Sequence, residues 1–420
     1  MRIMWIVNTI FPYPAEKMGL SKTVFGGWLI SLYESLSKKN IGEICIVSTY
    51  NGKDLKKYSD KNTIYYLIPN KYENKPDYST KKYWDKIIKE FTPDIIHIHG
   101  TEYPKTIPLI MNHHNENYVV SIQGFLNSYK RVCYCNLNPI VFLKNITIRD
   151  ILKPKTGYMV GLDYEKRAKY EKMIIENVDN VIGRTEWDYA QVKAINPEIN
   201  YYHGDENLRE CFYKDKWNIE KIERHTIFFS QSQAILKGFY IMVEAINILK
   251  KKYPDIKVKV AGNNILDTNT IKKKLKRQSY TRYLQKLIKQ YNIQDNIQYT
   301  GFLDAEAYKN ELIKSHVYVQ AASIENSSNS LGEAMILGVP CVASNVGGTS
   351  TMLKDKEEGF LYPYTEPELL AIYIEKYFES DELCKKYSGN ARKTALKRHD
   401  WKKNTDEVIN AYISIIKNKR

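Results

Sequence analysis

The sequence lacks any apolar run long enough to cross a bilayer. Spanning the hydrocarbon core takes roughly 20 consecutive apolar residues, and no stretch of the 420 residues approaches that length. The opening residues, MRIMWIVNTIFPYP, also lack the longer apolar core and the small-residue cleavage site of a secretory signal, and they favour a first strand instead. These absences predict a cytoplasmic protein.

Cysteine is scarce and scattered. Of the six cysteines, only Cys133 and Cys135 lie close together. A C-x-C pair without a second pair or a nearby histidine is a poor zinc motif, so we expect reduced thiols. His97 and His99 share one face of a predicted strand, but no third ligand stands at a fitting spacing. The sequence therefore predicts no metal site.

Acidic residues are too few to balance the basic ones. Lys and Arg number 63 against 48 Asp and Glu, which gives a formal net charge of +15. This balance favours an anionic partner: nucleic acid, an anionic membrane surface or a phosphorylated substrate. The run KKKLKR at 272–277 lacks the interleaved aromatic residues of a single-strand site. A solvated helix face is its favoured interpretation, and we do not expect nucleic acid as a partner.

Short apolar segments alternate with helical patterns in two successive rounds. Strands are predicted at 2–8, 43–49, 63–69, 93–100 and 118–124, and again at 225–232, 256–262, 296–303 and 317–322. Such alternation is typical of parallel α/β sheets, which bind ligands at the carboxyl ends of their strands. We therefore predict two domains, at 1–205 and 206–400, each with a parallel sheet, and a ligand cleft between them.

The stretch IENSSNSLGEAMILGVPCVASNVGG at 324–348 combines two kinds of ligand chemistry. Glu325 and Glu333 flank a polar run that resembles a helix start. Backbone N–H groups at a helix start favour an anion, whereas carboxylates suit sugar hydroxyls, so the combination indicates a nucleotide-sugar site. A structural alternative stays open, because Ser330 and Glu333 also have the spacing of a capping box.

Further candidate ligand-binding residues, most of them glycines, lie in the loops that follow the predicted strands. They are Gly26 and Gly27, Gln123 and Gly124, Lys237 and Gly238, Gly262, Gly301, and Gly347 and Gly348. Because the carboxyl ends of parallel strands meet at one edge of a sheet, this distribution favours the functional interpretation of Glu325 and Glu333.

Three segments resemble the retaining nucleotide-sugar glycosyltransferases of family 4. They are LKGFYIMVEAINILKKKYPDIKVKVAG, IQYTGFL and ENSSNSLGEAMILGVPCVASNVGGTSTML, within about residues 225–365; GGWL, PDIIHIHG and GRTEWD extend the resemblance more weakly into the first half. The resemblance implies the GT-B architecture, two Rossmann-like domains facing across a cleft. It also implies hexosyl transfer, with retention, from a nucleoside-diphosphate sugar to a glycan or lipid-linked acceptor, as in bacterial capsule and other surface polysaccharide synthesis.

The resemblance implies roles for individual residues. Two residues would be catalytic: Glu325 would contact the donor sugar, and Lys237 would contact the pyrophosphate. Glu333 would accept hydrogen bonds from the ribose hydroxyls. The remaining donor-binding residues would be Gly26, Gly27, Ser330, Leu331, Gly238, Gly262 and Phe302, and the acceptor or sugar would contact Gln123, Gly124 and His99. No Asp-x-Asp motif stands in a suitable loop, so we expect neither a metal nor another cofactor.

Two positions depart from the family pattern. Ser232 stands where many relatives have an arginine, and Gln123 stands where many have a histidine. A glutamine can bind a sugar hydroxyl but cannot act as a base, so we assign no general base. The helix predicted at 401–420 is expected to pack back on the first domain, as is usual in this family.

The segment 125–155 mixes basic with apolar residues. It could lie on an anionic membrane, at the inner face of the plasma membrane, or form a helix with a solvated face. Two alternatives to the main functional hypothesis also stay open. One is a basic, non-catalytic protein that binds polyanions or nucleic acid, and the other is a phosphorylase or epimerase of GT-B architecture.

Overall fold

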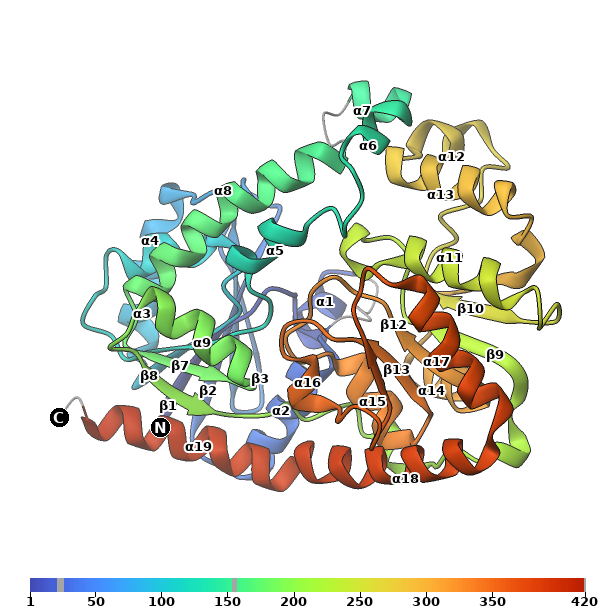
Figure 1. Ribbon diagram of the computed structural model, residues 1–420. Coiled ribbons are helices and arrows are strands. Elements are labelled where there is room, and N and C mark those ends of the chain that lie inside the picture. Colours follow the sequence, from blue (N-terminus) through green and yellow to red (C-terminus); the bar gives the residue numbers. More distant parts are fainter. Residues whose placement is uncertain (21–25, 153–156, 419–420) are drawn as a thin grey trace. The chain divides into compact units, whose positions relative to one another are not determined.

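The computed structural model describes residues 1–20, 26–152 and 157–418 (Figure 1). The chain divides into two compact units. Unit 1 comprises Met1–Asn127, Glu165–Leu208 and His399–Arg420, and unit 2 comprises Ser128–Tyr164 and Arg209–Arg398. Residues 128–164 therefore group with the second half of the chain, although the sequence analysis placed them in the first.

Unit 1 is built on an eight-stranded sheet in the order β3-β4-β2-β1-β5-β6-β7-β8. The strands are β1 (Arg2–Ile6), β2 (Glu43–Tyr50), β3 (Lys56–Asp60), β4 (Thr63–Pro69), β5 (Ile95–His99), β6 (Tyr118–Ser121), β7 (Asn180–Gly183) and β8 (Asn200–His203). Edge strand β3 pairs antiparallel with β4, and the other pairings are parallel. The helices are α1 (Pro12–Lys17), α2 (Gly27–Lys38), α3 (Lys81–Phe91), α4 (Ile107–Ile110), most of α8 (Gly157–Glu176), α9 (Glu186–Ile195) and α19 (Trp401–Asn418).

The two faces of this sheet bury separate cores. Because side chains alternate along a strand, Met4 and Ile6 of β1 enter one cluster and Ile3 and Trp5 enter the other. Helices α2 and α19 cover the second face, which includes Tyr412. The terminal helix α19 thus completes the core of unit 1.

Unit 2 contains a six-stranded, wholly parallel sheet in the order β11-β10-β9-β12-β13-β14. The strands are β9 (Glu223–Phe229), β10 (Lys257–Ala261), β11 (Ile297–Gly301), β12 (Ser315–Gln320), β13 (Cys341–Ser344) and β14 (Phe360–Tyr362). The longer helices are α11 (Phe239–Leu249), α13 (Ser279–Gln290), α14 (Ala305–Lys314), α15 (Asn329–Leu337), α17 (Pro367–Glu379) and α18 (Asp381–Arg398). The short ones are α6 (Ile140–Lys144), α7 (Ile148–Leu152), α10 (Cys211–Lys214), α12 (Ile271–Lys276) and α16 (Thr349–Met352); α5 (Leu126–Val132) begins at the unit boundary.

The prediction of two Rossmann-like sheets is confirmed, with three local differences. The predicted loop after β1 contains α1, whose first helical residue, Pro12, has a fixed φ that suits a helix start. Helix α3 is not among the predicted elements; it forms because its apolar face buries Trp84, Ile87 and Phe91. The segment 125–155 forms three short helices, and residues 153–156 lie outside the described part of the chain.

No helix in the described part of the chain has both the length and the apolar character needed to span a membrane.

Candidate functional site

Glu333 lies on α15, almost wholly buried at 4% exposure. Its two carboxylate oxygens accept hydrogen bonds from Nε and Nη2 of Arg209, each at 2.7 Å. The guanidinium also lies over the rings of Phe212 and Tyr308, at 4.7 and 5.1 Å from the ring centres. Burial raises the pKa of Glu333, and Arg209 opposes this shift. This planar, two-bond pairing is the geometry that arginine offers a carboxylate.

The capping-box alternative for Glu333 does not hold. The N-cap of α15 is Ser328 rather than Ser330, and its hydroxyl accepts the N–H of Leu331 at 3.4 Å. Glu333 therefore lies five residues beyond the cap, and both of its oxygens are directed to Arg209. Ser330 lies in the first turn, where backbone N–H groups have no acceptor within the helix.

The side chains of Lys237 and Glu325 meet directly. Lys237 ends a short 3₁₀ turn (Ile235–Lys237) after β9, and Glu325 lies in the loop between β12 and α15. The ammonium group of Lys237 donates to Oε1 of Glu325. The side chains are 27% and 12% exposed, respectively. The structure thus brings together the two residues predicted to be catalytic, at the carboxyl ends of two paired strands.

Two glycines allow the backbone around this pair to approach closely. Gly238 has a φ of +66°, and a Cβ there would lie 1.9 Å from the carbonyl oxygen of Ala321. Gly347 has a φ of +52°, and its Cβ would lie 2.0 Å from the carbonyl oxygen of Glu325. Gly348 also donates its N–H to that oxygen, at 3.0 Å. The paired glycines of the sequence motif therefore hold the Glu325 loop in place.

The remaining predicted donor residues of unit 2 lie at the ends of β10 and β11. Gly262 donates its N–H to the carbonyl of Gly301 at 2.9 Å, and Phe302 beyond it is 61% exposed. Ser232, which replaces the family's arginine, is buried, and its hydroxyl lies 2.9 Å from that of Tyr299. Ser232 brings no positive charge to this region, whereas Lys237 contacts Glu325 through its ammonium group.

In unit 1, Gly26 and Gly27 begin α2. Gly26 is its N-cap, with a φ of +78°, and Gly27 is its first residue. The segment 21–25 just before them lies outside the described residues.

Gln123 lines a small cavity of about 20 Å³ in unit 1, together with Trp28, Ser121 and Arg184. This volume suits one ordered water or one small polar group. Gly124 donates its N–H to Oε1 of Glu102 at 2.7 Å, and burial raises the pKa of Glu102. Gln123 and Arg184 thus line the same small cavity, just beyond the carboxyl end of β6, and a contact of Gln123 with a sugar hydroxyl stays a prediction.

His99 lies inside the core rather than at a surface. It is 2% exposed, with ring centres 3.8 Å from His97 and 4.5 Å from Trp5. Burial, together with the charge that His97 would carry, holds the pKa of His99 well below its ordinary value. His97 lies between the hydroxyls of Tyr412 and Ser121, each at 2.6 Å. A sugar contact from His99 stays a prediction, and its burial does not favour it.

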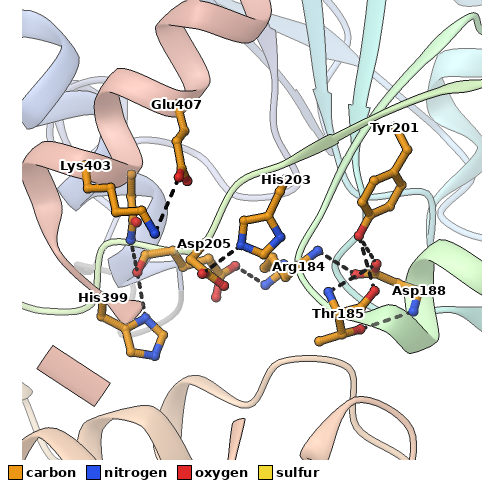
Figure 2. Close-up of polar contacts among 11 residues, drawn as sticks. Arg184, Thr185, Asp188, Tyr201, His203, Asp205, His399, Lys403 and Glu407 are labelled. Carbon is orange, nitrogen blue, oxygen red and sulfur yellow. Dashed lines mark hydrogen bonds and ion pairs between the residues drawn. The ribbon is translucent and has the colours of Figure 1, made fainter. Parts of the chain in front are cut away.

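The GRTEWD segment of unit 1 forms a local polar network (Figure 2). Thr185 and Asp188 make a capping box at the start of α9, and the hydroxyl of Tyr201 donates to Asp188 at 2.5 Å. Arg184 contacts the carboxylate of Glu206 at 2.5 Å and is 3% exposed. The resemblance noted for this segment therefore rests on residues that hold α9 and the end of β7 in place.

Arg209 is the site residue that sequence reasoning missed. It stands 124 positions before Glu333, in the loop that follows β8. No local spacing links the two residues, and a lone arginine before a short helix gives no signal of its own. Among the described residues, no group of three or more His, Cys, Asp or Glu side chains is placed to hold a metal ion.

Part of unit 2 matches a known protein family. Residues 213–394 match the family described as glycosyl transferases group 1. The matched residues all lie in unit 2. This match contains Lys237, Glu325 and Glu333, whereas Arg209 lies four residues before it begins.

Curated relatives match the chain over part of its length. YtcC of Bacillus subtilis, whose glycosyltransferase assignment is itself provisional, is 26% identical over 183 residues, which are 43% of this chain and 42% of YtcC. The phosphatidyl-myo-inositol mannosyltransferase of Mycobacterium tuberculosis is 22% identical over 196 residues, 45% of this chain and 47% of its own. The chain thus spans less than half of the length of these relatives.

Solved structures share the fold over nearly the whole chain. Sucrose-phosphate synthase from Thermosynechococcus elongatus superposes with a TM-score of 0.73 at 14% identity, covering 99% of both chains. HepE from Anabaena, in complex with UDP and glucose, gives a TM-score of 0.64 at 13% identity, covering 99% of this chain and 100% of its own. Units 1 and 2, each built on a Rossmann-like sheet, therefore correspond to the two domains of a GT-B fold.

Proposed function

We propose that the protein is a retaining hexosyltransferase that moves a sugar from a nucleoside-diphosphate sugar to a glycan or lipid-linked acceptor. The observation that carries the proposal is the contact between Lys237 and Glu325 at the carboxyl ends of β9 and β12. These side chains offer a cation for the leaving diphosphate and a carboxylate for sugar hydroxyls or for the positive charge that develops at the anomeric carbon.

Glu333 and the start of α15 complete the proposed donor site. The backbone N–H groups of Asn329 and Ser330 stand in the first turn of α15, where a helix attracts anionic phosphate. Each carboxylate oxygen of Glu333 accepts one bond from Arg209 and can accept another from a ribose hydroxyl. In this arrangement Arg209 holds the carboxylate in one orientation, and Glu333 binds the ribose hydroxyls of the donor.

The names of similar proteins support a sugar-nucleotide donor. The HepE structure was determined with UDP and glucose, and the mycobacterial relative is named for mannosyl transfer to a phosphatidylinositol. By analogy we propose an acceptor in surface polysaccharide or capsule synthesis, reached at the cytoplasmic face of a membrane. Gln123 and Arg184 are the proposed acceptor-side groups of unit 1, and no metal or other cofactor enters the proposal.

The test is a panel of UDP-, GDP- and ADP-sugars, assayed for binding by calorimetry and for slow hydrolysis by release of the nucleoside diphosphate. We expect one base to be preferred. Glu325→Gln should bind the donor but lose at least about a hundredfold in turnover, because it removes a charge used in the transition state. The matched control is Glu368→Gln, an exposed glutamate at the start of α17.

Three outcomes separate the alternatives. If no donor binds and Glu325→Gln changes nothing, the enzyme proposal fails. If inorganic phosphate replaces the acceptor and yields a sugar phosphate, the protein is a phosphorylase, and if the sugar is isomerised without transfer, it is an epimerase. Salt-sensitive binding to random oligonucleotides, without any binding of sugar nucleotides, would favour the polyanion-binding alternative.

A further inference from the structure

Unit 2 exposes a concentration of large apolar side chains far from the Lys237–Glu325 pair in sequence. On α7 and just before it, Ile146, Ile148, Ile151 and Leu152 are 40%, 59%, 67% and 75% exposed. Most exposed leucines and isoleucines in soluble proteins occur singly, whereas clusters mark an interaction surface. The neighbouring helix α6 adds Ile140 and Leu143, at 51% and 57% exposure.

A second segment, distant in sequence, joins this cluster. Helix α12 packs beside α7, and α13 packs beside α6 (Figure 1). On α12, Ile271 is 78% exposed and Leu275 is 48% exposed. We call the exposed apolar side chains of α6, α7 and α12, with Ile146, the α6–α7–α12 surface.

Hydrogen bonds fix the two segments to each other. The hydroxyl of Thr147 donates to the carbonyl of Arg277 at 2.7 Å, and Nη1 of Arg282 donates to the carbonyl of Ile146 at 2.8 Å. These hydrogen bonds therefore hold α7 and the end of α12 in fixed positions, together with the apolar side chains that they carry.

The charges on this surface are predominantly positive. Lys144 of α6 and Lys274 and Lys276 of α12 are exposed beside the apolar side chains. The acidic residue of α7, Asp150, is instead 3% exposed, and its carboxylate accepts the backbone N–H of Thr147 at 3.0 Å. The negative charge thus points inward, and the lysines point to solvent.

We propose that the α6–α7–α12 surface docks on an anionic lipid bilayer. The isoleucines and leucines enter the boundary between headgroups and acyl chains, and the lysines bind the lipid phosphates. A surface that combines exposed apolar side chains with exposed lysines is complementary to such a bilayer. A second copy of this chain would instead bring the same positive charges against one another. Lys274, Leu275 and Lys276 of the KKKLKR run, which the sequence favours as a solvated helix face, thereby belong to the proposed membrane-binding surface.

This inference goes beyond sugar transfer and does not depend on it. The test is flotation of the full chain with vesicles of phosphatidylcholine alone, or of equal parts phosphatidylcholine and phosphatidylglycerol. We expect binding only to the anionic vesicles, weakening as salt is raised. Ile148→Glu/Ile151→Glu should lower the partition coefficient at least about tenfold, because it places charge in the apolar boundary.

Lys274→Glu/Lys276→Glu tests the charge without touching the apolar residues, and we again expect a loss of at least about tenfold. Two matched controls carry the same changes elsewhere. Ile372→Glu/Ile413→Glu alters exposed isoleucines of α17 and α19, and Lys393→Glu/Lys397→Glu alters exposed lysines of α18. Both controls should float like the wild type, and circular dichroism confirms that each variant is folded.

Three results would overturn the proposal. One is equal recovery with neutral and anionic vesicles, and another is wild-type flotation of both surface variants. The third is a lipid-free dimer in sedimentation that Ile148→Glu/Ile151→Glu converts to monomer, which would make the surface an interface between copies. Donor hydrolysis in lipid-free solution should be unchanged in the surface variants, so failure here is distinguishable from failure of the proposed enzyme activity.

Discussion

Arg209 and Glu333 bind each other through two parallel hydrogen bonds, each 2.7 Å long. The pair joins the loop after β8 to helix α15, and the carboxylate is 4% exposed. The residue proposed to bind ribose is therefore also one half of a buried ion pair. A single substitution at either residue would mix the structural effect with the functional one, so the two roles have to be tested together.

Arg209→Met should lower the free energy of unfolding by about 3 kcal/mol, because it leaves the Glu333 carboxylate buried without its cation. The double variant Arg209→Met/Glu333→Leu should recover most of that loss, since apolar side chains can replace a buried ion pair at little cost. Urea unfolding measures both effects.

The same double variant separates the two roles of Glu333. It should stay folded yet bind the donor about tenfold or more weakly, because the ribose loses a hydrogen-bond acceptor. Full donor affinity in the stable double variant would contradict a ribose contact at Glu333 and leave it a purely structural residue.

Lys237→Ala should affect catalysis far more than stability. The Lys237–Glu325 contact is partly exposed, so its loss should cost less than about 1 kcal/mol of folding free energy. Turnover should fall at least about a hundredfold, because the leaving diphosphate loses its cation. Lys237→Arg should restore part of the rate. A Lys237→Ala enzyme with normal kcat would remove Lys237 from the proposed mechanism.

Gly347→Ala should both destabilise the fold and impair the donor site. Its φ of +52° strains any other residue, and the added Cβ would lie 2.0 Å from the carbonyl oxygen of Glu325. We expect a loss of roughly 2 kcal/mol and a reduced donor affinity. Gly389→Ala is the control: Gly389 lies in α18 with nothing within 4 Å of its Cβ position. There alanine should stabilise by about 0.5–1 kcal/mol. Equal thermal shifts in the two variants would contradict the packing argument.

Acid should unfold unit 1 through its two buried histidines. Burial lowers the pKa of His97 to about 3, and that of His99 lies well below its ordinary value. Because both values lie below that of an unfolded histidine, the neutral rings contribute stability that is present above about pH 6.5. This stability is lost as pH falls toward 3, by at most about 1.4 kcal/mol per pH unit for each ring.

Urea midpoints at several pH values measure this slope. His99→Gln should flatten it, because one buried titrating ring is removed. His114→Asn, which changes an exposed histidine, should leave it unchanged. An unaltered slope in His99→Gln would show that other groups govern the acid transition.

The sequence predicted the sheets because their signals are local. Strands such as 225–232 and 256–262 are short apolar runs between helical patterns, and each can be identified without its neighbours. The cap of α15 shows the limit of such signals. Ser328 and Ser330 stand in the same polar run, and the spacing to Glu333 pointed to the wrong one.

Other features could not be read locally because they depend on contacts between distant segments. Residues 128–164 group with unit 2 through bonds such as that of the Tyr240 hydroxyl to the Cys135 carbonyl at 2.6 Å. The partnership of Glu333 with Arg209 spans 124 positions. By contrast, Lys237 and Glu325 stand out in the sequence, because both follow predicted strands and both lie in segments that resemble family 4 glycosyltransferases.

The hydrogen bond from Trp5 to Tyr412 has a consequence for the order in which the protein is made. Indole Nε1 on the first strand donates at 3.0 Å to a hydroxyl 407 positions later, on α19. All of unit 2 is translated between these two residues. Translation of unit 1 therefore starts before that of unit 2 and is completed after it. Until α19 emerges, this face of the unit 1 sheet is covered by α2 but lacks the α19 part of its cover, and exposed apolar surface of this kind makes a nascent chain prone to aggregation.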